Sequence, residues 1–261
     1  MHMSMERRNF ESGSLTLSYL DAGGKGEPII GLHAHWMEAQ TFMPLAESLK
    51  PWRVIALDQR GHGYSDHASS YTRDDYLRDL AALYAHLGLR RAILLGNSLG
   101  GVNAYQFAAR HPDRVRALVI EDIGAVVQDD ISFVLKWTGT FEAREQLEGA
   151  VGPRFLPYLK DSFREGPDGW RLAFDPKEML ESQRCLLGDH WKDWLGSCCP
   201  ALLIRGKESR VTSRAHLEEM AAQRPNTIYR HLPGGHVVHL DSPEAFTHAV
   251  RDLLVECAGS G

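Results

Sequence analysis

Short apolar runs alternate along this chain with longer segments whose apolar positions follow helical spacing. Residues 14–20 alternate as a strand does and end in a glycine-containing turn at 21–24. The apolar runs after it predict strands at 28–32, 53–57, 92–95, 117–120, 201–204 and 227–232. Helical spacing predicts helices near 39–50, 72–87, 98–110, 213–223 and 243–256. Apolar strands that alternate with helices indicate an α/β protein, with a mostly parallel sheet covered by helices on both faces.

The alternation stops between residues 124 and 197, where no convincing strand pattern is found. Helical spacing appears at 131–151 and 176–187, and four of the six tryptophans of the chain fall in this stretch, at positions 137, 170, 191 and 194. We therefore expect a helical lid at 124–197, inserted into a core domain made of 1–123 and 198–261. The alternative for the tryptophans is that they only pack the insertion against the core.

Composition narrows the class of protein. The 261 residues are 43% hydrophobic and 24% charged, with a formal net charge of -5, so one domain with an insertion is enough and nucleic acid is not an expected partner. No apolar run approaches the roughly 18 residues of a membrane helix, and residues 1–5 lack a signal-peptide core. The four cysteines show neither disulfide nor metal spacing. We expect a cytoplasmic protein that acts on a small molecule, without metal or cofactor; its oligomeric state stays open.

A serine stands where one predicted strand meets the next helix. The stretch 94–101 reads Leu-Leu-Gly-Asn-Ser-Leu-Gly-Gly, which places Ser98 in a G-x-S-x-G pattern between a strand and a helix. In that context the pattern indicates a nucleophile, because the flanking glycines allow a turn sharp enough to expose the hydroxyl at the head of a helix. An ordinary helix N-cap is the alternative for Ser98.

Four segments together make the chain resemble the α/β-hydrolases, and the resemblance extends over residues 14 to 256. Within that family the chain is most similar to a lid-bearing, serine esterase-like branch. These segments are 32–36, 58–66, the serine turn at 96–100, and 234–246. The resemblance implies a hydrolase and a triad in the chain order serine, acid, histidine. It also implies that Asp58, Arg60, Gly61 and Gly63 have structural roles in their turn.

His236 follows the last predicted strand on a short glycine-containing loop, and the resemblance implies that it is the base that activates Ser98. His239, three residues later, is the weaker alternative. Backbone N–H groups form the oxyanion hole in this family, and the matching positions here are Leu99 and His35. The chain has Ala34 where the family usually has glycine, and the side chain of His35 could also face the pocket.

The position of the triad acid is the open question. The commonest family position follows strand 201–204, but it holds Ser209 here, with Glu208 beside it. Some lid-bearing relatives carry the acid after the strand that follows the nucleophile, and Asp122 stands there, 24 residues after Ser98. We expect Asp122 to be the acid, with Glu121 and Glu208 as alternatives.

A serine nucleophile with a histidine base predicts acyl transfer to water, so we expect an esterase or lactonase acting on a small to medium, apolar or aromatic substrate. Family members that open epoxides or displace halide have aspartate at position 98, so the serine argues against both reactions. Carbon-carbon bond hydrolases acting on vinylogous diketones also carry Gly-Asn-Ser and are the enzyme alternative, although they usually have tryptophan where this chain has Val237. A ligand-binding receptor is the non-enzyme alternative.

Overall fold

A computed structural model describes residues 5–259, so residues 1–4, which form part of the segment examined for a signal peptide, lie outside it. The strands are β1 (Glu6–Ser12), β2 (Leu15–Asp21), β3 (Pro28–Leu32), β4 (Arg53–Leu57), β5 (Ala92–Asn97), β6 (Val115–Glu121), β7 (Val126–Val127), β8 (Phe163–Gly166), β9 (Gly169–Leu172), β10 (Gly188–Asp189), β11 (Ala201–Gly206) and β12 (Thr227–Leu232). The α-helices are α1 (Met43–Ser48), α2 (Arg73–His86), α3 (Leu99–Arg110), α4 (Arg144–Val151), α5 (Leu156–Leu159), α6 (Pro176–Leu186), α7 (Trp191–Trp194), α8 (Arg214–Gln223), α9 (Val238–Asp241) and α10 (Pro243–Gly259). Short 3-10 helices cover Ala39–Phe42, Pro112–Arg114, Ser132–Trp137 and Lys160–Ser162.

The main sheet has eight strands in the order β1-β2-β4-β3-β5-β6-β11-β12. The six strands from β4 to β12 pair in parallel, and β1 and β2 add an antiparallel edge. The chain runs from β3 outward to β4 and then returns to the other side of β3 with β5, so the strand order reverses between β3 and β5. Ligand sites of open parallel sheets lie at such a switch point, beyond the carboxyl ends of the strands.

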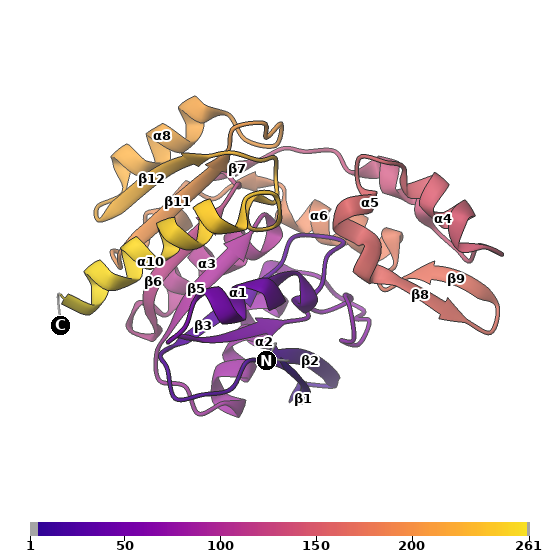
Figure 1. Ribbon diagram of the computed structural model, residues 1–261, viewed down its shortest axis with the longest axis horizontal. Coiled ribbons are helices and arrows are strands. Elements are labelled where there is room, and N and C mark those ends of the chain that lie inside the picture. The colour runs from indigo at the N-terminus through magenta and orange to yellow at the C-terminus, as the bar shows by residue number, and fades with distance from the viewer. Residues whose placement is uncertain (1–4, 260–261) are drawn as a thin grey trace.

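Helices cover both faces of this sheet, as Figure 1 shows. Neighbouring residues of one strand point to opposite faces, so Ile29 of β3 packs in the cluster that contains α1 and α10, and Ile30 packs with α2, α3 and α8. Both side chains are fully buried. The predicted α/β class, with a mostly parallel sheet between two helical layers, is confirmed.

The segment between β6 and β11 is called the insertion below, and Figure 1 shows its α4, α5 and β8–β9 hairpin extending to one side of the core. The expectation that it contains no strand is wrong, because β8 pairs with β9 and β7 pairs with β10. The hairpin turns at Gly166-Pro167-Asp168-Gly169, and Gly169 has a φ of 118° that favours glycine. A short turn of this composition between two segments is a hairpin signal in the sequence.

The tryptophans of the insertion hold it together. Trp137 and Trp194 are almost completely buried, and each indole N–H donates to a backbone carbonyl, Trp137 to Ala150 and Trp194 to Met220. Met220 belongs to α8 of the core, so Trp194 joins the end of the insertion to the sheet. Within residues 5–259, no helix has the length and apolarity to cross a bilayer.

Candidate active site

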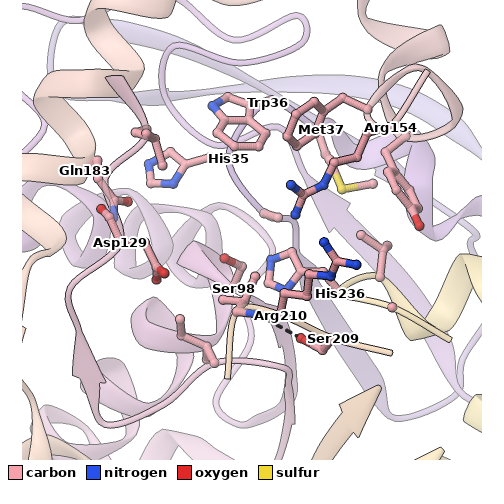
Figure 2. Close-up of a pocket in the computed structure, with 18 of the residues that line it drawn as sticks. His35, Trp36, Met37, Ser98, Asp129, Arg154, Gln183, Ser209, Arg210 and His236 are labelled. Carbon is pink, nitrogen blue, oxygen red and sulfur yellow. Dashed lines mark hydrogen bonds between the residues drawn. The ribbon is translucent and has the colours of Figure 1, made fainter. Parts of the chain in front are cut away.

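A cavity of about 430 Å³ lies where the strand-end loops face the insertion. The core contributes the loops after β3, β5, β11 and β12, and the insertion contributes most of the opposite wall. Figure 2 shows Ser98 and His236 from the core, with Asp129, Arg154 and Gln183 from the insertion, around this space. The cavity therefore lies at the switch point that the strand order indicates.

Ser98 is the one residue between β5 and α3, and its backbone conformation is strained. Its φ is 52° and its ψ is -117°, values that L-residues rarely adopt. A Cβ at Gly96 would collide with the Gly100 backbone, and a Cβ at Gly100 would collide with the Leu32 carbonyl, so both glycines are required by close backbone packing. The side chain of Ser98 makes no capping hydrogen bond to α3. The alternative that the hydroxyl is an N-cap is therefore wrong, and the side chain lines the cavity instead.

His236 and Asp122 are in direct contact. His236 Nδ1 lies 2.7 Å from Asp122 Oδ2, and because a carboxylate can only accept, the imidazole donates at Nδ1. His236 is partly exposed and lines the cavity, whereas the Asp122 side chain is completely buried behind it. Asn97 Nδ2 donates to the backbone carbonyls of His236 at 3.0 Å and Glu121 at 3.2 Å. The residue before Ser98 therefore fixes the loop that carries the histidine.

Two hydroxyl groups from the loop after β11 complete the surroundings of Asp122. Ser209 Oγ donates to Oδ2 at 2.5 Å, and Thr212 Oγ1 donates to Oδ1 at 2.8 Å. With His236, three donors converge on one buried carboxylate and fix the position of both of its oxygens. Asp122 has a φ of 50°, as unusual as that of Ser98. Ser209, at the commonest family position of the acid, thus supplies a hydrogen bond to the carboxylate; sequence reasoning missed this role and that of Thr212.

The other two acid candidates have different partners. Glu208 Oε2 accepts from the backbone N–H of Gly234 at 2.5 Å and has no contact with His236. Glu121 pairs with His239, whose Nδ1 lies 2.7 Å from Oε2, and neither side chain is exposed. The second ring nitrogen of His239 is hydrogen-bonded to Thr41 at 2.8 Å. Glu121 and His239 therefore form a separate buried pair that joins β6 to α9.

The two expected oxyanion donors are available as backbone groups. The N–H of Leu99 and the N–H of His35 donate to no backbone carbonyl within residues 5–259. The side chain of His35 is buried, lines the cavity and is hydrogen-bonded through Nε2 to Ser182 Oγ at 2.9 Å, so the insertion holds it. Burial lowers the pKa of His35 well below its usual value, and the nearby His62 acts in the same direction. The imidazole is therefore neutral at pH 7.

The loop after β3, which contains Ala34, is held by hydrogen bonds to the next strand-end loop. His33 Nε2 accepts the backbone N–H of Gln59 at 3.0 Å, and Gln59 Nε2 donates to the His33 carbonyl at 2.7 Å. The unusual backbone falls at Trp36, whose φ is 71°. The positive φ that the loop requires therefore lies two residues after Ala34.

The turn at 58–66 has the structural role that the resemblance implied. Asp58 is completely buried, accepts the backbone N–H of Ala39 at 2.7 Å and forms an ion pair with Arg7. Arg60 pairs with Asp79 at 2.7 Å, and Gly61 and Gly63 have positive φ values. None of these residues lines the cavity. Across residues 5–259 there is also no cluster of three His, Cys, Asp or Glu side chains with the spacing of a metal site.

Comparison with known proteins identifies the superfamily of this chain. The family model described as "alpha/beta hydrolase fold" matches residues 27–148. A crystal structure of E-2-(acetamidomethylene)succinate hydrolase is similar, with a TM-score of 0.86 and 27% sequence identity over 96% of this chain and 99% of that one. The chain belongs to the α/β-hydrolase superfamily.

Two sequence relatives match this α/β-hydrolase along almost its full length. The 2-(acetamidomethylene)succinate hydrolase of Mesorhizobium japonicum is 28% identical over 95% of this chain and 94% of its own. An sn-1-specific diacylglycerol lipase of Mus musculus is 27% identical over 96% of this chain and 89% of its own. A solved α/β-hydrolase from Novosphingobium aromaticivorans has a TM-score of 0.80 at 29% identity, with 96% of this chain and 98% of that chain covered. The two named activities differ in substrate, so the relatives support a hydrolase without indicating which bond it cleaves.

Proposed function

We propose that the protein is a serine hydrolase that cleaves a carboxylic ester or lactone through an acyl-enzyme, with Ser98 as nucleophile, His236 as base and Asp122 as acid. The observation that carries this proposal is the 2.7 Å contact between His236 and the buried carboxylate of Asp122, in a cavity that Ser98 also lines. A serine hydroxyl attacks only when a base can take its proton and an acid fixes the tautomer of that base.

The proposed reaction uses each of these groups in turn. The imidazole of His236 holds its Nδ1 proton against Asp122, which leaves Nε2 free to take the proton of Ser98 as the oxygen attacks the carbonyl. The N–H groups of Leu99 and His35 receive the oxyanion, and the dipole of α3 favours the same negative charge. His236 then donates its proton to the leaving alkoxide, and water hydrolyses the acyl-enzyme by the same steps. The neutral side chain of His35 adds no positive charge near the oxyanion.

The walls of the cavity favour a small to medium substrate with an apolar or aromatic portion. Its apolar lining includes Ile123, Val127, Ile131, Phe133 and Phe155. All five residues lie between β6 and β11, so we assign this insertion the role of a lid that shapes the substrate pocket. Relatives named as a diacylglycerol lipase and as an enol-lactonase, the latter from Acinetobacter baylyi, are consistent with ester or lactone hydrolysis.

Carbon-carbon bond hydrolysis of a vinylogous diketone is the second candidate, because Asn97 before Ser98 gives the Gly-Asn-Ser sequence that such hydrolases share. Val237 after the histidine argues against it, since those enzymes usually have tryptophan there. A binding protein with the same fold and no turnover is the remaining possibility. The same set of measurements separates all three.

The test uses 4-nitrophenyl esters of increasing acyl length and a fluorophosphonate that labels activated serines. We expect turnover that depends on acyl length and one adduct, on Ser98. Ser98→Ala should lose both, while Ser213→Ala, which only removes the cap of α8, should keep both. Turnover of vinylogous diketones alone would favour the second candidate. No turnover and no adduct would refute the hydrolase proposal.

A further inference from the structure

Two arginines project into the cavity from opposite walls. Arg154 comes from the insertion, between α4 and α5, and Arg210 comes from the loop after β11, directly after Ser209. In Figure 2 both guanidinium groups point into the cavity on the side of His236. Neither residue follows from a family motif, so sequence reasoning did not single them out.

Neither guanidinium has an anionic partner. Among residues 5–259 neither guanidinium forms an ion pair or a hydrogen bond. Arg154 makes a cation–π contact, with its guanidinium carbon 5.2 Å from the centroid of the Phe155 ring. Arg154 and Arg210 are both exposed, whereas three less exposed arginines are paired with carboxylates: Arg53 with Asp21 at 2.5 Å, Arg60 with Asp79 at 2.7 Å and Arg164 with Glu38 at 2.5 Å. The cavity therefore has two positive charges that the protein itself does not neutralise.

The acidic residues of the cavity do not neutralise these charges. Asp130 accepts from the backbone and hydroxyl of Ser132, and Glu208 accepts from Gly234. Among residues 5–259 no other residue donates a hydrogen bond to the Asp129 carboxylate, but Figure 2 places Asp129 on the opposite side of Ser98 from the two arginines. Burial raises the pKa of Asp129, and protonation of His236 would oppose that shift. The cavity is thus positive on one side of the nucleophile and negative on the other.

We propose that Arg154 and Arg210 form a carboxylate subsite, so that the substrate carries a carboxylate at the far end of its acyl chain. A guanidinium presents donors in a planar fork that matches the two oxygens of a carboxylate, and two such forks hold one group from both walls. Asp129 repels the same carboxylate from the other end of the cavity and so fixes which way the substrate enters. The apolar lining between the two ends accommodates the carbon chain.

This inference rests on the proposed serine hydrolase, and the test separates the two. The substrates are 4-nitrophenyl hexanoate and the 4-nitrophenyl half-ester of adipic acid, which have the same chain length and differ by one terminal carboxylate. We expect a preference for the half-ester in kcat/KM that weakens as salt is added, because both arginines are exposed to solvent. Shorter half-esters of succinic and glutaric acid measure how far the subsite lies from Ser98.

The variants are Arg154→Gln, Arg210→Gln and the double variant, with Arg184→Gln as the control. Arg184 is an exposed arginine of α6, outside the cavity, so it tests the loss of one charge alone. Hydrogen bonds to a charged group predict a rise of about 10- to 100-fold in KM for the half-ester in each single variant. We expect kcat to change little and the neutral ester to be unaffected in every variant.

Each outcome has one meaning. Turnover of the neutral ester without a preference for the half-ester, or a preference that the double variant retains, would overturn the subsite and leave the hydrolase standing. An equal loss on both esters would also overturn it, because the arginines would then act on the fold. Stronger competitive inhibition by inorganic phosphate than by adipate would show that the anion is not a carboxylate. Failure with both esters, together with no phosphonate adduct, would instead refute the hydrolase.

Discussion

Replacing Asp122 with asparagine changes the charge behind His236 and almost nothing else. Three donors converge on the buried carboxylate, from His236, Ser209 and Thr212. An asparagine has one oxygen that accepts and one nitrogen that donates. If the nitrogen faces His236, the imidazole must move its proton to Nε2, the atom that has to receive the proton of Ser98. If the oxygen faces His236, the tautomer is kept, but no negative charge stabilises the imidazolium.

Both orientations therefore weaken the transition state and leave the nucleophile in place. Loss of a triad acid with its geometry kept lowers kcat by about 10⁴, which corresponds to about 5 kcal/mol. We expect a loss of this order for Asp122→Asn, with a nearly constant KM because Asp122 does not line the cavity. The assay is steady-state hydrolysis of the best 4-nitrophenyl ester, with the melting temperature of each variant as a check of folding.

Two neighbouring carboxylates provide matched controls. Glu208→Gln should lose little activity, since Glu208 contacts Gly234 and not the imidazole. Glu121→Gln should mainly destabilise the fold, because it breaks a fully buried pair with His239. The reasoning would be refuted if folded Asp122→Asn kept most of its kcat, or if Glu208→Gln lost as much.

Three further predictions concern stability and are measured by urea unfolding. Gly100→Ala should destabilise the fold by about 1–3 kcal/mol, because the added Cβ meets the backbone of β3. Gly149→Ala, in an open position of α4, should instead stabilise the fold by about 0.5–1 kcal/mol. Equal stabilities of the two variants would contradict the packing argument. Burial raises the pKa of Glu38 to about 7, from its usual 4.5, although Arg164 opposes the shift. The contribution of Glu38 to stability is then greatest below pH 4.5 and falls as the pH rises to about 7. The stability of Glu38→Gln relative to wild type should therefore increase through that window. A difference in stability that does not change with pH would show that the carboxyl is not buried. Thr212→Val removes a hydrogen bond to a buried carboxylate and should cost about 1.5–3 kcal/mol, whereas Thr212→Ser, which retains the hydroxyl, should cost clearly less.

The strands of the core could be predicted from sequence because a buried parallel strand is a continuous apolar run. The predicted bounds of β3 (Pro28–Leu32), β4 (Arg53–Leu57) and β12 (Thr227–Leu232) agree with the structure. β1 (Glu6–Ser12) was missed because it is a charged edge strand with only two buried positions. The hairpin of β8 and β9 was missed because the sequence indicates it by the residues of its turn and not by alternating apolar positions.

The residues of the candidate site likewise fall into two groups, those that a local sequence motif indicates and those that it does not. Ser98 and His236 stand in local motifs, and the resemblance supplied the spacing that selected Asp122 before the structure placed it 2.7 Å from the histidine. The hydroxyl of Thr212 and the guanidinium of Arg154 belong to no motif. They reach the site only through tertiary folding, since Thr212 lies 90 residues after the carboxylate that it contacts. No local pattern could therefore have identified them.

Three of the four non-glycine residues with positive φ among residues 5–259 stand at successive strand ends around the cavity: Trp36, Ser98 and Asp122. Residues held in such conformations cost of order 1–3 kcal/mol each. At Ser98, whose hydroxyl makes no capping hydrogen bond to α3, selection for folding alone would favour glycine, and the chain would gain stability as it lost its proposed nucleophile. At Trp36 and Asp122 the strain is offset by ring contacts and by three hydrogen bonds. Laboratory evolution of this protein toward higher melting temperatures, without a screen for turnover, should lose activity first at Ser98.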